Sequence, residues 1–184
     1  MWSYIFFSSS LVAALIFVLI LLATVNTKKF QFYPPPKKEG WQHPTFMFLF
    51  RVFVYSLIAL TILQFQLKKY DYAVLVYVVG GLLFTIGFGL AFYITFNMGW
   101  RNAFGEKRGL KTSGWFSWSR NPIYVVTWIG LLGWGLIAHS ILVSMLLSVW
   151  AVFYYLAPVF EEPWLEKMYG KEYLAYKEKV RRFF

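Results

Sequence analysis

Five consecutive residues in the C-terminal half of the chain combine a cation, an amide and a phenol: Arg120, Asn121, Pro122, Ile123 and Tyr124. Proline suits the first turn of a helix, because its missing N–H would have no partner there. Arg120 and Asn121 would then stand at a helix N-terminus, whose free N–H groups favour a carboxylate or a phosphate. The alternative is structural, with an arginine at the lipid headgroups and a capping asparagine.

A pair of acids, Glu161 and Glu162, stands farther along the chain, immediately before Pro163. The dipole of a helix that restarts at this proline would be enough to explain both acids. Two carboxylates near lipid are nevertheless costly without cationic partners. An arginine beside two acids would suit a zwitterionic cofactor. S-adenosylmethionine, which carries a sulfonium, an ammonium and a carboxylate, is one candidate.

The segment between these two clusters is expected to bring them together. Residues 121–160 form an uncharged run of 40 residues. A straight helix of that length would extend about 60 Å, which is twice the thickness of the hydrocarbon core. We therefore expect a helical hairpin that turns near His139, and this hairpin places Arg120 and Glu161 on the same face of the membrane.

The composition places the whole chain in a membrane. Of its 184 residues, 59% are hydrophobic and 14% are charged, whereas ordinary globular chains are about 45–50% apolar and about 25% charged. Three further apolar runs are long enough to span a bilayer. The prediction is an all-α, polytopic protein organised as one membrane domain over residues 1–184, with five spans at 4–26, 46–67, 72–98, 122–138 and 140–160.

Two further features concern packing. The glycines of the third span are expected to mark close helix packing, since small residues let membrane helices approach; they are Gly80, Gly81, Gly87 and Gly89. The tail predicts an amphipathic cytoplasmic helix over residues 163–182. Its apolar face would carry Tyr169, Tyr173, Tyr176 and Val180. The chain has no cysteine, which excludes disulfides and thiolate-bound metals, and no metal site is predicted.

The basic residues set the expected orientation. The formal net charge is +10, and 15 of the 18 Lys and Arg residues lie in residues 27–45, in residues 100–120 or after residue 160. Only Lys68 and Lys69 fall on the opposite side, and Arg51 lies at a span edge. The positive-inside rule then predicts an external N-terminus and a cytoplasmic C-terminus. The expected partners are membrane lipids and a lipophilic substrate, and nucleic acid is not among them.

Taken in order, the two clusters resemble the isoprenylcysteine carboxyl methyltransferase family and its prokaryotic relatives, with related motifs in the phospholipid methyltransferases. The resemblance rests on roughly the C-terminal 75 residues and on both clusters with a hairpin between them. In two positions the chain departs from the family pattern, since Asn121 replaces a histidine and Val126 replaces a glycine. The matching residues are Arg120, Asn121, Pro122, Ile123, Tyr124, Glu161, Glu162, Leu165, Tyr169, Gly170, Tyr173, Tyr176 and Val180.

The resemblance implies S-adenosylmethionine in a cytoplasm-facing pocket that is enclosed by the tail helix, with a lipophilic substrate entering sideways from the bilayer. Carried over by position, the catalytic residues would be Arg120 and Glu162. The implied cofactor contacts are Arg120, Asn121, Pro122, Tyr124, Glu161, Glu162, Leu110 and Gly114. The implied methyl acceptor is a prenylated cysteine carboxylate, and the alternatives are a phospholipid amine and a small lipophilic thiol.

Methyl transfer from a sulfonium is an in-line displacement, so that catalysis consists mostly of alignment in a dry site. A carboxylate or thiolate acceptor needs no general base, whereas an amine must lose a proton, which Glu161 or Glu162 would accept. Two other functions remain open on the sequence alone. One is an NADPH-dependent membrane reductase of the sterol type, which has a similar C-terminal helical build, and the other is a non-enzymatic membrane scaffold.

Overall fold

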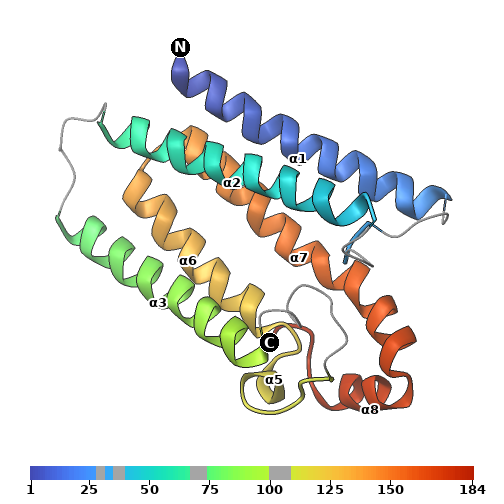
Figure 1. The fold of residues 1–184 in the computed structure, drawn as a ribbon. Helices are drawn as coiled ribbons and strands as arrows, with labels where there is room; N and C mark the ends of the chain where they lie inside the picture. The colour runs from blue at the N-terminus through green and yellow to red at the C-terminus, as the bar shows by residue number, and fades with distance from the viewer. Residues whose placement is uncertain (28–31, 35–39, 67–73, 100–108) are drawn as a thin grey trace. The chain divides into compact units, whose positions relative to one another are not determined.

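The computed structural model of the chain describes residues 1–27, 32–34, 40–66, 74–99 and 109–184 (Figure 1). All regular secondary structure in these ranges is helical, which confirms the predicted all-α architecture. In chain order the helices are α1 (Trp2–Thr27), α2 (Gln42–Gln66), α3 (Val74–Met98), α5 (Trp115–Trp118), α6 (Pro122–Ala138), α7 (Ile141–Tyr169) and α8 (Lys171–Lys179).

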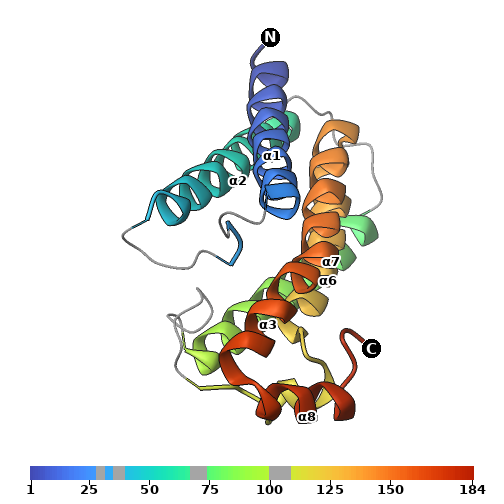
Figure 2. The same ribbon diagram turned by 90° about the vertical axis from the view of Figure 1, so that its right-hand side faces the viewer.

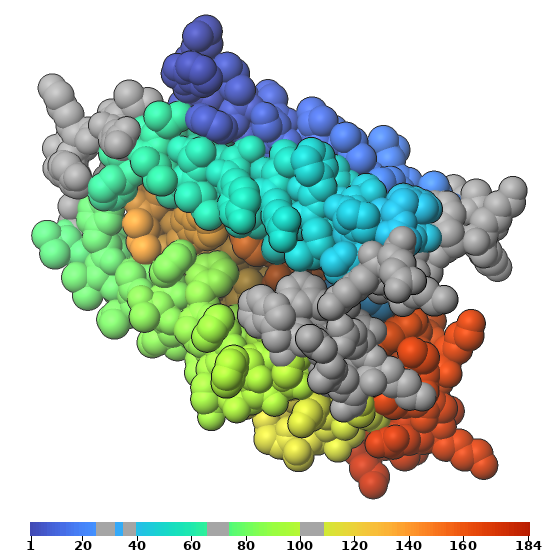
Figure 3. Space-filling model, viewed as in Figure 1, coloured from blue at the N-terminus to red at the C-terminus, as the bar shows by residue number. Residues whose placement is uncertain are grey.

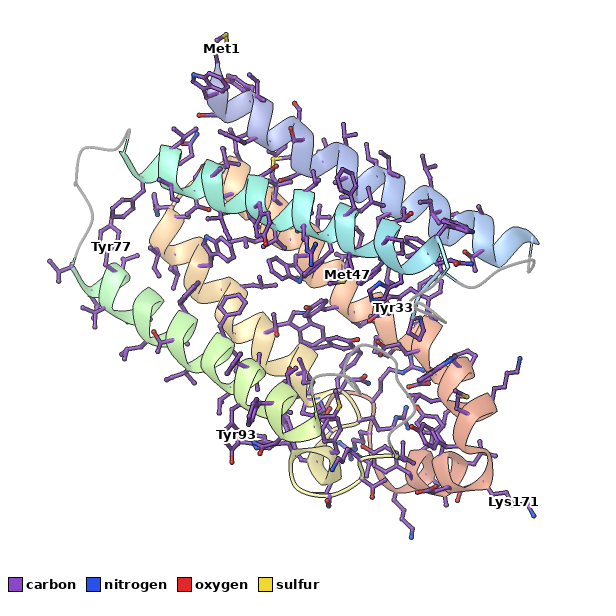
Figure 4. The ribbon with its side chains drawn as sticks, viewed as in Figure 1. Met1, Tyr33, Met47, Tyr77, Tyr93 and Lys171 are labelled. Atoms are coloured by element: carbon purple, nitrogen blue, oxygen red, sulfur yellow. The ribbon has the colours of Figure 1, made fainter. Side chains whose placement is uncertain are left out.

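Four of the described helices, α1, α2, α3 and α7, are long and apolar enough to cross a membrane. Helix α6 is also apolar, but its 17 residues extend only about 26 Å, slightly less than the hydrocarbon core. Large apolar side chains remain exposed on the outer faces of these helices, including Leu19, Phe48 and Phe96. Figure 4 shows Tyr93 pointing away from α3 in the same manner. Such faces are typical of a multi-pass membrane protein.

The chain divides into two compact units. The first unit comprises Met1–Val78 and Gly135–Trp150, and the second comprises Val79–Trp134 and Ala151–Phe184. The organisation as one membrane domain stays a prediction. So does the orientation, which depends in part on basic residues outside the described ranges: Lys28, Lys29, Lys37, Lys38, Lys68, Lys69, Arg101, Lys107 and Arg108.

In the first unit, α1 and α2 lie side by side (Figures 2 and 3). The buried hydroxyl of Ser10 donates a hydrogen bond of 3.0 Å to the carbonyl of Phe53, which links the two helices at a polar point. Phe50 and Phe53 each meet the ring of Trp150 edge to face, at 5.9 Å between centroids. Aromatic packing therefore ties α2 to the first half of α7.

In the second unit, α3 and α6 approach each other through glycines. A Cβ on Gly87 would overlap the backbone of Gly130, and a Cβ on Gly133 would overlap the backbone of Phe84. The packing role predicted for Gly87 is confirmed, and Gly80, whose carbonyl faces Gly133, shares it. The same prediction was wrong for Gly81 and Gly89, because no atom of a facing element among the described residues lies within 4 Å of a Cβ built there.

The predicted hairpin is confirmed. Helix α6 ends at Ala138, α7 begins at Ile141, and His139 between them has a positive φ of 43°. In the second unit the Trp128 indole donates a 3.1 Å hydrogen bond to the carbonyl of Ala151, which joins α6 to α7. The turn thus reverses the chain and returns α7 alongside α6.

The tail differs from the prediction of a separate helix over residues 163–182. Pro163 lies inside α7, which continues to Tyr169. A proline inside a helix loses one backbone hydrogen bond, but side-chain contacts of Glu161 and Glu162 fix this turn of α7 to the start of α6. The break comes at Gly170, whose φ of 53° favours glycine. Helix α8 then runs across the end of α7 (Figure 2).

Candidate functional site

The start of α6 is joined to the end of α8 through Arg120. Pro122 is the first residue of α6, as predicted, and Arg120 lies in a bend two residues before it. The side chain of Arg120 is only 9% exposed. Its Nη1 donates hydrogen bonds to the carbonyls of Lys177 at 2.8 Å and Val180 at 3.1 Å, and its backbone N–H donates to the carbonyl of Arg181 at 2.9 Å. The guanidinium is therefore fixed by the backbone of the tail.

Glu162 is the buried acid of the site. Its carboxylate accepts hydrogen bonds from Arg120 Nη2 at 2.9 Å, from Arg182 Nε at 2.8 Å and from Arg182 Nη2 at 2.7 Å. Lys177 Nζ lies 3.8 Å away and also pairs with Glu166 at 2.6 Å. With 6% of its side chain exposed, the carboxylate needs these cations, since an unpaired buried charge is strongly unfavourable. The hydrogen bond to Glu162 in turn raises the pKa of Arg182 above its usual value.

Asn121 holds the same segment of the tail. Its amide Nδ2 donates a 3.0 Å hydrogen bond to the carbonyl of Arg182, and the Ser119 hydroxyl donates to that carbonyl at 3.2 Å. The backbone N–H of Asn121 donates to the Ser119 oxygen at 3.1 Å. In this structure the side chain of Asn121 therefore positions Arg182, and its predicted contact with a cofactor stays a prediction.

Tyr124 and Glu161 form a second pair on the same two helices. The Tyr124 hydroxyl donates a 2.5 Å hydrogen bond to Glu161 Oε1, and the Tyr124 ring packs on Tyr154 with centroids 4.6 Å apart. Both side chains are partly buried. The two acids consequently have different surroundings, because Glu162 is neutralised by guanidinium groups and Glu161 meets a phenol.

Two tyrosines of the predicted amphipathic face attach α8 to the rest of this unit. Tyr173 and Tyr176 are buried, as that face predicted. The Tyr176 hydroxyl donates a 2.6 Å hydrogen bond to the carbonyl of Phe116 in α5. Burial raises the pKa of Tyr176 to about 12, and burial together with the nearby Glu162 charge raises the pKa of Tyr173 as well. Both phenols are therefore neutral at physiological pH.

Leu110 and Gly114 lie on the loop before α5. Gly114 has a φ of 63°, which explains the glycine, and it immediately precedes α5. The neighbouring Gly109 meets Tyr169 at the end of α7 through a backbone hydrogen bond to the tyrosine. The loop therefore approaches the same end of α7 as the site, while the predicted cofactor contacts of Leu110 and Gly114 stay predictions.

The sequence reasoning missed Arg182. It supplies two of the three short hydrogen bonds to Glu162, yet from the sequence it was counted only among the basic residues after residue 160 that set the orientation. The charge balance could have indicated this residue. The prediction gave the two adjacent acids only one cationic partner, Arg120, although six basic residues follow Phe160. What the sequence did not reveal is the reversal at Gly170 that returns Arg182 to α7.

One hydrogen-bond donor of the site is left without a partner by the contacts described above. The Nε of Arg120 is buried and has no hydrogen-bond partner among the described residues. Beside Arg120 lies an open hollow of about 670 Å³, whose other lining residues are 177–184. The arrangement can therefore bind an anionic group next to a fixed guanidinium. The described residues contain no group of three metal-ligating side chains.

Comparison with known protein families identifies a match to the C-terminal half of the chain. The family model described as phospholipid methyltransferase matches residues 75–172. That segment includes α3, α6, α7 and both motif clusters, and it ends before Lys177 and Arg182. No curated protein and no solved structure matches the chain.

Proposed function

The chain belongs to the phospholipid methyltransferase family, and from this premise we propose that it transfers a methyl group from S-adenosylmethionine to a lipophilic acceptor at the cytoplasmic face of the membrane. The family establishes a multi-pass membrane methyltransferase that acts on lipophilic substrates. The cofactor, the acceptor and the membrane face are the proposed parts. The observation that supports the cofactor and the acceptor is that Arg120 contacts Glu162, and Tyr124 contacts Glu161, within one unit. The proposed membrane face rests on the distribution of basic residues along the sequence.

The described residues fit the cofactor's charged groups. S-adenosylmethionine supplies a methyl group on a positively charged sulfur, and it carries an amino-acid end with a carboxylate and an ammonium. The buried, unpartnered Nε of Arg120 is a donor for a carboxylate. Glu161 is the acid assigned to the cationic part, because Glu162 is already surrounded by Arg120 and Arg182. We therefore assign Glu162 a positioning role, which replaces the catalytic role expected for it.

A prenylated cysteine carboxylate is the acceptor that the C-terminal motifs favour. Its oxygen nucleophile is already anionic at neutral pH, so that this chain needs only to align it and to exclude water. Exposed apolar side chains of α6 and α7, such as Leu132, Val152 and Leu156, give a lipid tail an apolar surface on the two helices that also carry Tyr124, Glu161 and Glu162. This acceptor requires no proton transfer by Glu161.

A phospholipid amine is the second candidate acceptor, and the description of the matching family favours it. An ammonium must lose a proton before it can attack a methyl group. Glu161, hydrogen-bonded to the Tyr124 hydroxyl at 2.5 Å, is the acid placed to take that proton. Glu162 is unsuitable, since protonating it would break contacts with two guanidinium groups.

Transfer of labelled methyl groups tests the proposal and separates the two acceptors. The full chain, reconstituted in lipid nanodiscs, would be incubated with methyl-labelled S-adenosylmethionine and either farnesylated N-acetylcysteine or phosphatidylethanolamine. We expect label in one lipid product, lost in Arg120→Lys, which keeps the charge but not the planar fork, and retained in the exposed control Lys171→Gln. No label in either lipid, with correctly folded protein, would overturn the proposed activity.

Tyr124→Phe distinguishes the acceptors further. The substitution removes the hydroxyl that holds Glu161 and keeps the ring that packs on Tyr154. If an amine is the acceptor, we expect kcat to fall by about tenfold or more and its pH dependence to shift, because general-base catalysis typically contributes at least about a hundredfold. If a carboxylate is the acceptor, the pH dependence should not change.

A further inference from the structure

The open hollow beside Arg120 is unusually rich in positive charge. It is lined by Arg120 and by residues 177–184, and all of these belong to the second unit. Five of the lining side chains are basic, and only Glu178 is acidic. The region around the hollow therefore has the electrostatic character of an anion site.

Not all of this charge is neutralised within the structure. Arg120, Lys177 and Arg182 pair with Glu162 or Glu166. Lys179 and Arg181 are exposed, and neither forms an ion pair with any residue that the structure describes. These two side chains are thus cations that the fold of the second unit does not need for its own ion pairs.

Aromatic side chains beside the hollow indicate where it lies relative to lipid. Phe183 packs on Trp128 of α6, with centroids 5.0 Å apart, and Phe184 meets Trp118 at 6.2 Å. Trp118 is 51% exposed and Phe184 is 68% exposed. Exposed aromatic residues next to basic ones are typical of the headgroup level of a bilayer. The hollow is accordingly accessible to a lipid headgroup.

We propose that this hollow binds the phosphate of an anionic phospholipid headgroup through Lys179 and Arg181, at a position separate from the methyl acceptor. The guanidinium of Arg181 suits a phosphate because its planar fork matches two phosphate oxygens. Lys179 adds a compact point charge, and Phe184 adds apolar contact with the glycerol region. This binding does not depend on the proposed methyl transfer, and it attaches the tail to the anionic leaflet.

Native mass spectrometry of the detergent-purified full chain tests the site. The protein would be titrated with dioleoyl phosphatidylglycerol and with dioleoyl phosphatidylcholine, which has the same phosphate but a neutralising choline. We expect tighter binding of phosphatidylglycerol, reduced about 30-fold in the double variant Lys179→Gln/Arg181→Gln, since each basic residue near an anionic surface contributes about fivefold. The single variant Arg181→Gln should lose about fivefold and serves if the double variant folds poorly.

A control of equal charge is available on the same part of the chain. Lys167 and Lys171 are exposed but do not line the hollow. Figure 4 shows Lys171, the first residue of α8, pointing outward. Lys167→Gln/Lys171→Gln should keep the preference for phosphatidylglycerol. Equal loss in both double variants, or no preference over phosphatidylcholine in the unaltered protein, would overturn the proposal. Displacement of the lipid by millimolar inorganic phosphate would assign the hollow to free phosphate and would also overturn it.

Discussion

Replacing Glu162 by glutamine is expected to destabilise the protein far more than the same change at the adjacent Glu161. The Glu162 carboxylate, 6% exposed, receives three hydrogen bonds from two guanidinium groups. An amide keeps one acceptor oxygen but directs an NH₂ donor at Arg182 Nη2, which now lies 2.7 Å from a carboxylate oxygen. It also leaves Arg120, 9% exposed, without its counter-charge.

The magnitude follows from burial. Removing one partner of a buried ion pair costs about 3–5 kcal/mol, and the lower value applies here because Arg182, 42% exposed, can regain contact with water. For a chain of this length, about 3 kcal/mol corresponds to a fall in Tm of about 6–12 °C. In Glu161→Gln the amide oxygen still accepts the Tyr124 hydroxyl, so that the part of the loss that comes from this hydrogen bond should be about 1 kcal/mol or less.

Thermal unfolding of the detergent-purified variants, followed by tryptophan fluorescence, measures both changes. A double-mutant cycle with Arg182→Gln adds an internal control, because the two losses should be less than additive by about 0.5–3 kcal/mol if the side chains interact directly. Equal shifts in Tm for Glu161→Gln and Glu162→Gln would refute the assignment of Glu162 to the buried ion-pair cluster. Fully additive losses in the cycle would refute its contact with Arg182.

Two further predictions concern packing and pH. Gly87→Ala and Gly133→Ala should each lower Tm markedly, because the added Cβ would meet backbone atoms of the facing helix. Gly81→Ala and Gly89→Ala place the Cβ in open space and should be neutral or slightly stabilising, because alanine favours a helix over glycine by about 1 kcal/mol. The contribution of Tyr176 to the free energy of unfolding should fall on the order of 2 kcal/mol between pH 10 and pH 12, because burial raises its pKa from 10.0 to about 12 in the folded protein and the stabilisation of its neutral phenol is lost as that group ionises. Tyr173, whose pKa is also raised, adds to the total loss in this range and above it. Chemical denaturation at pH 9 and pH 12 measures this, and an equal loss in Tyr176→Phe would contradict the assignment to that residue.

The helical hairpin could be predicted from the sequence because lengths alone require it. An uncharged run of 40 residues is too long to cross a bilayer in a single span. The turn at His139 follows from dividing the run into two spans of similar length. The meeting of Arg120 with Glu162 then follows from topology, and the structure places their side chains 2.9 Å apart. These inferences succeed because they depend on chain length and charge rather than on side-chain detail.

The predictions that were wrong or missing concern features that depend on tertiary contacts. The local preference of Pro163 to begin a helix is overridden where Glu162 fixes the preceding turn of α7. Arg182 lies twenty residues from Glu162, and only the reversal at Gly170 brings the two together. A single-sequence pattern contains the residue types but not the direction in which the chain turns after α7.

The glycines of α3 show which part of the helix packing the sequence pattern could predict. Gly80 and Gly87 are seven residues apart and share a helix face, and both face α6, whereas Gly81 and Gly89 lie elsewhere on the helix in open space. Composition predicted close packing correctly. The choice among the four glycines requires the partner helix, whose Gly130 and Gly133 supply the complementary surface.

Binding of S-adenosylmethionine is the most direct test of the proposed function. Calorimetric titration of the purified full chain with S-adenosylmethionine, and separately with NADPH, compares the methyltransferase with the reductase that the sequence left open. The account predicts saturable binding of S-adenosylmethionine, weakened in Arg120→Lys, and no binding of NADPH. Tight NADPH binding with no response to S-adenosylmethionine would contradict it.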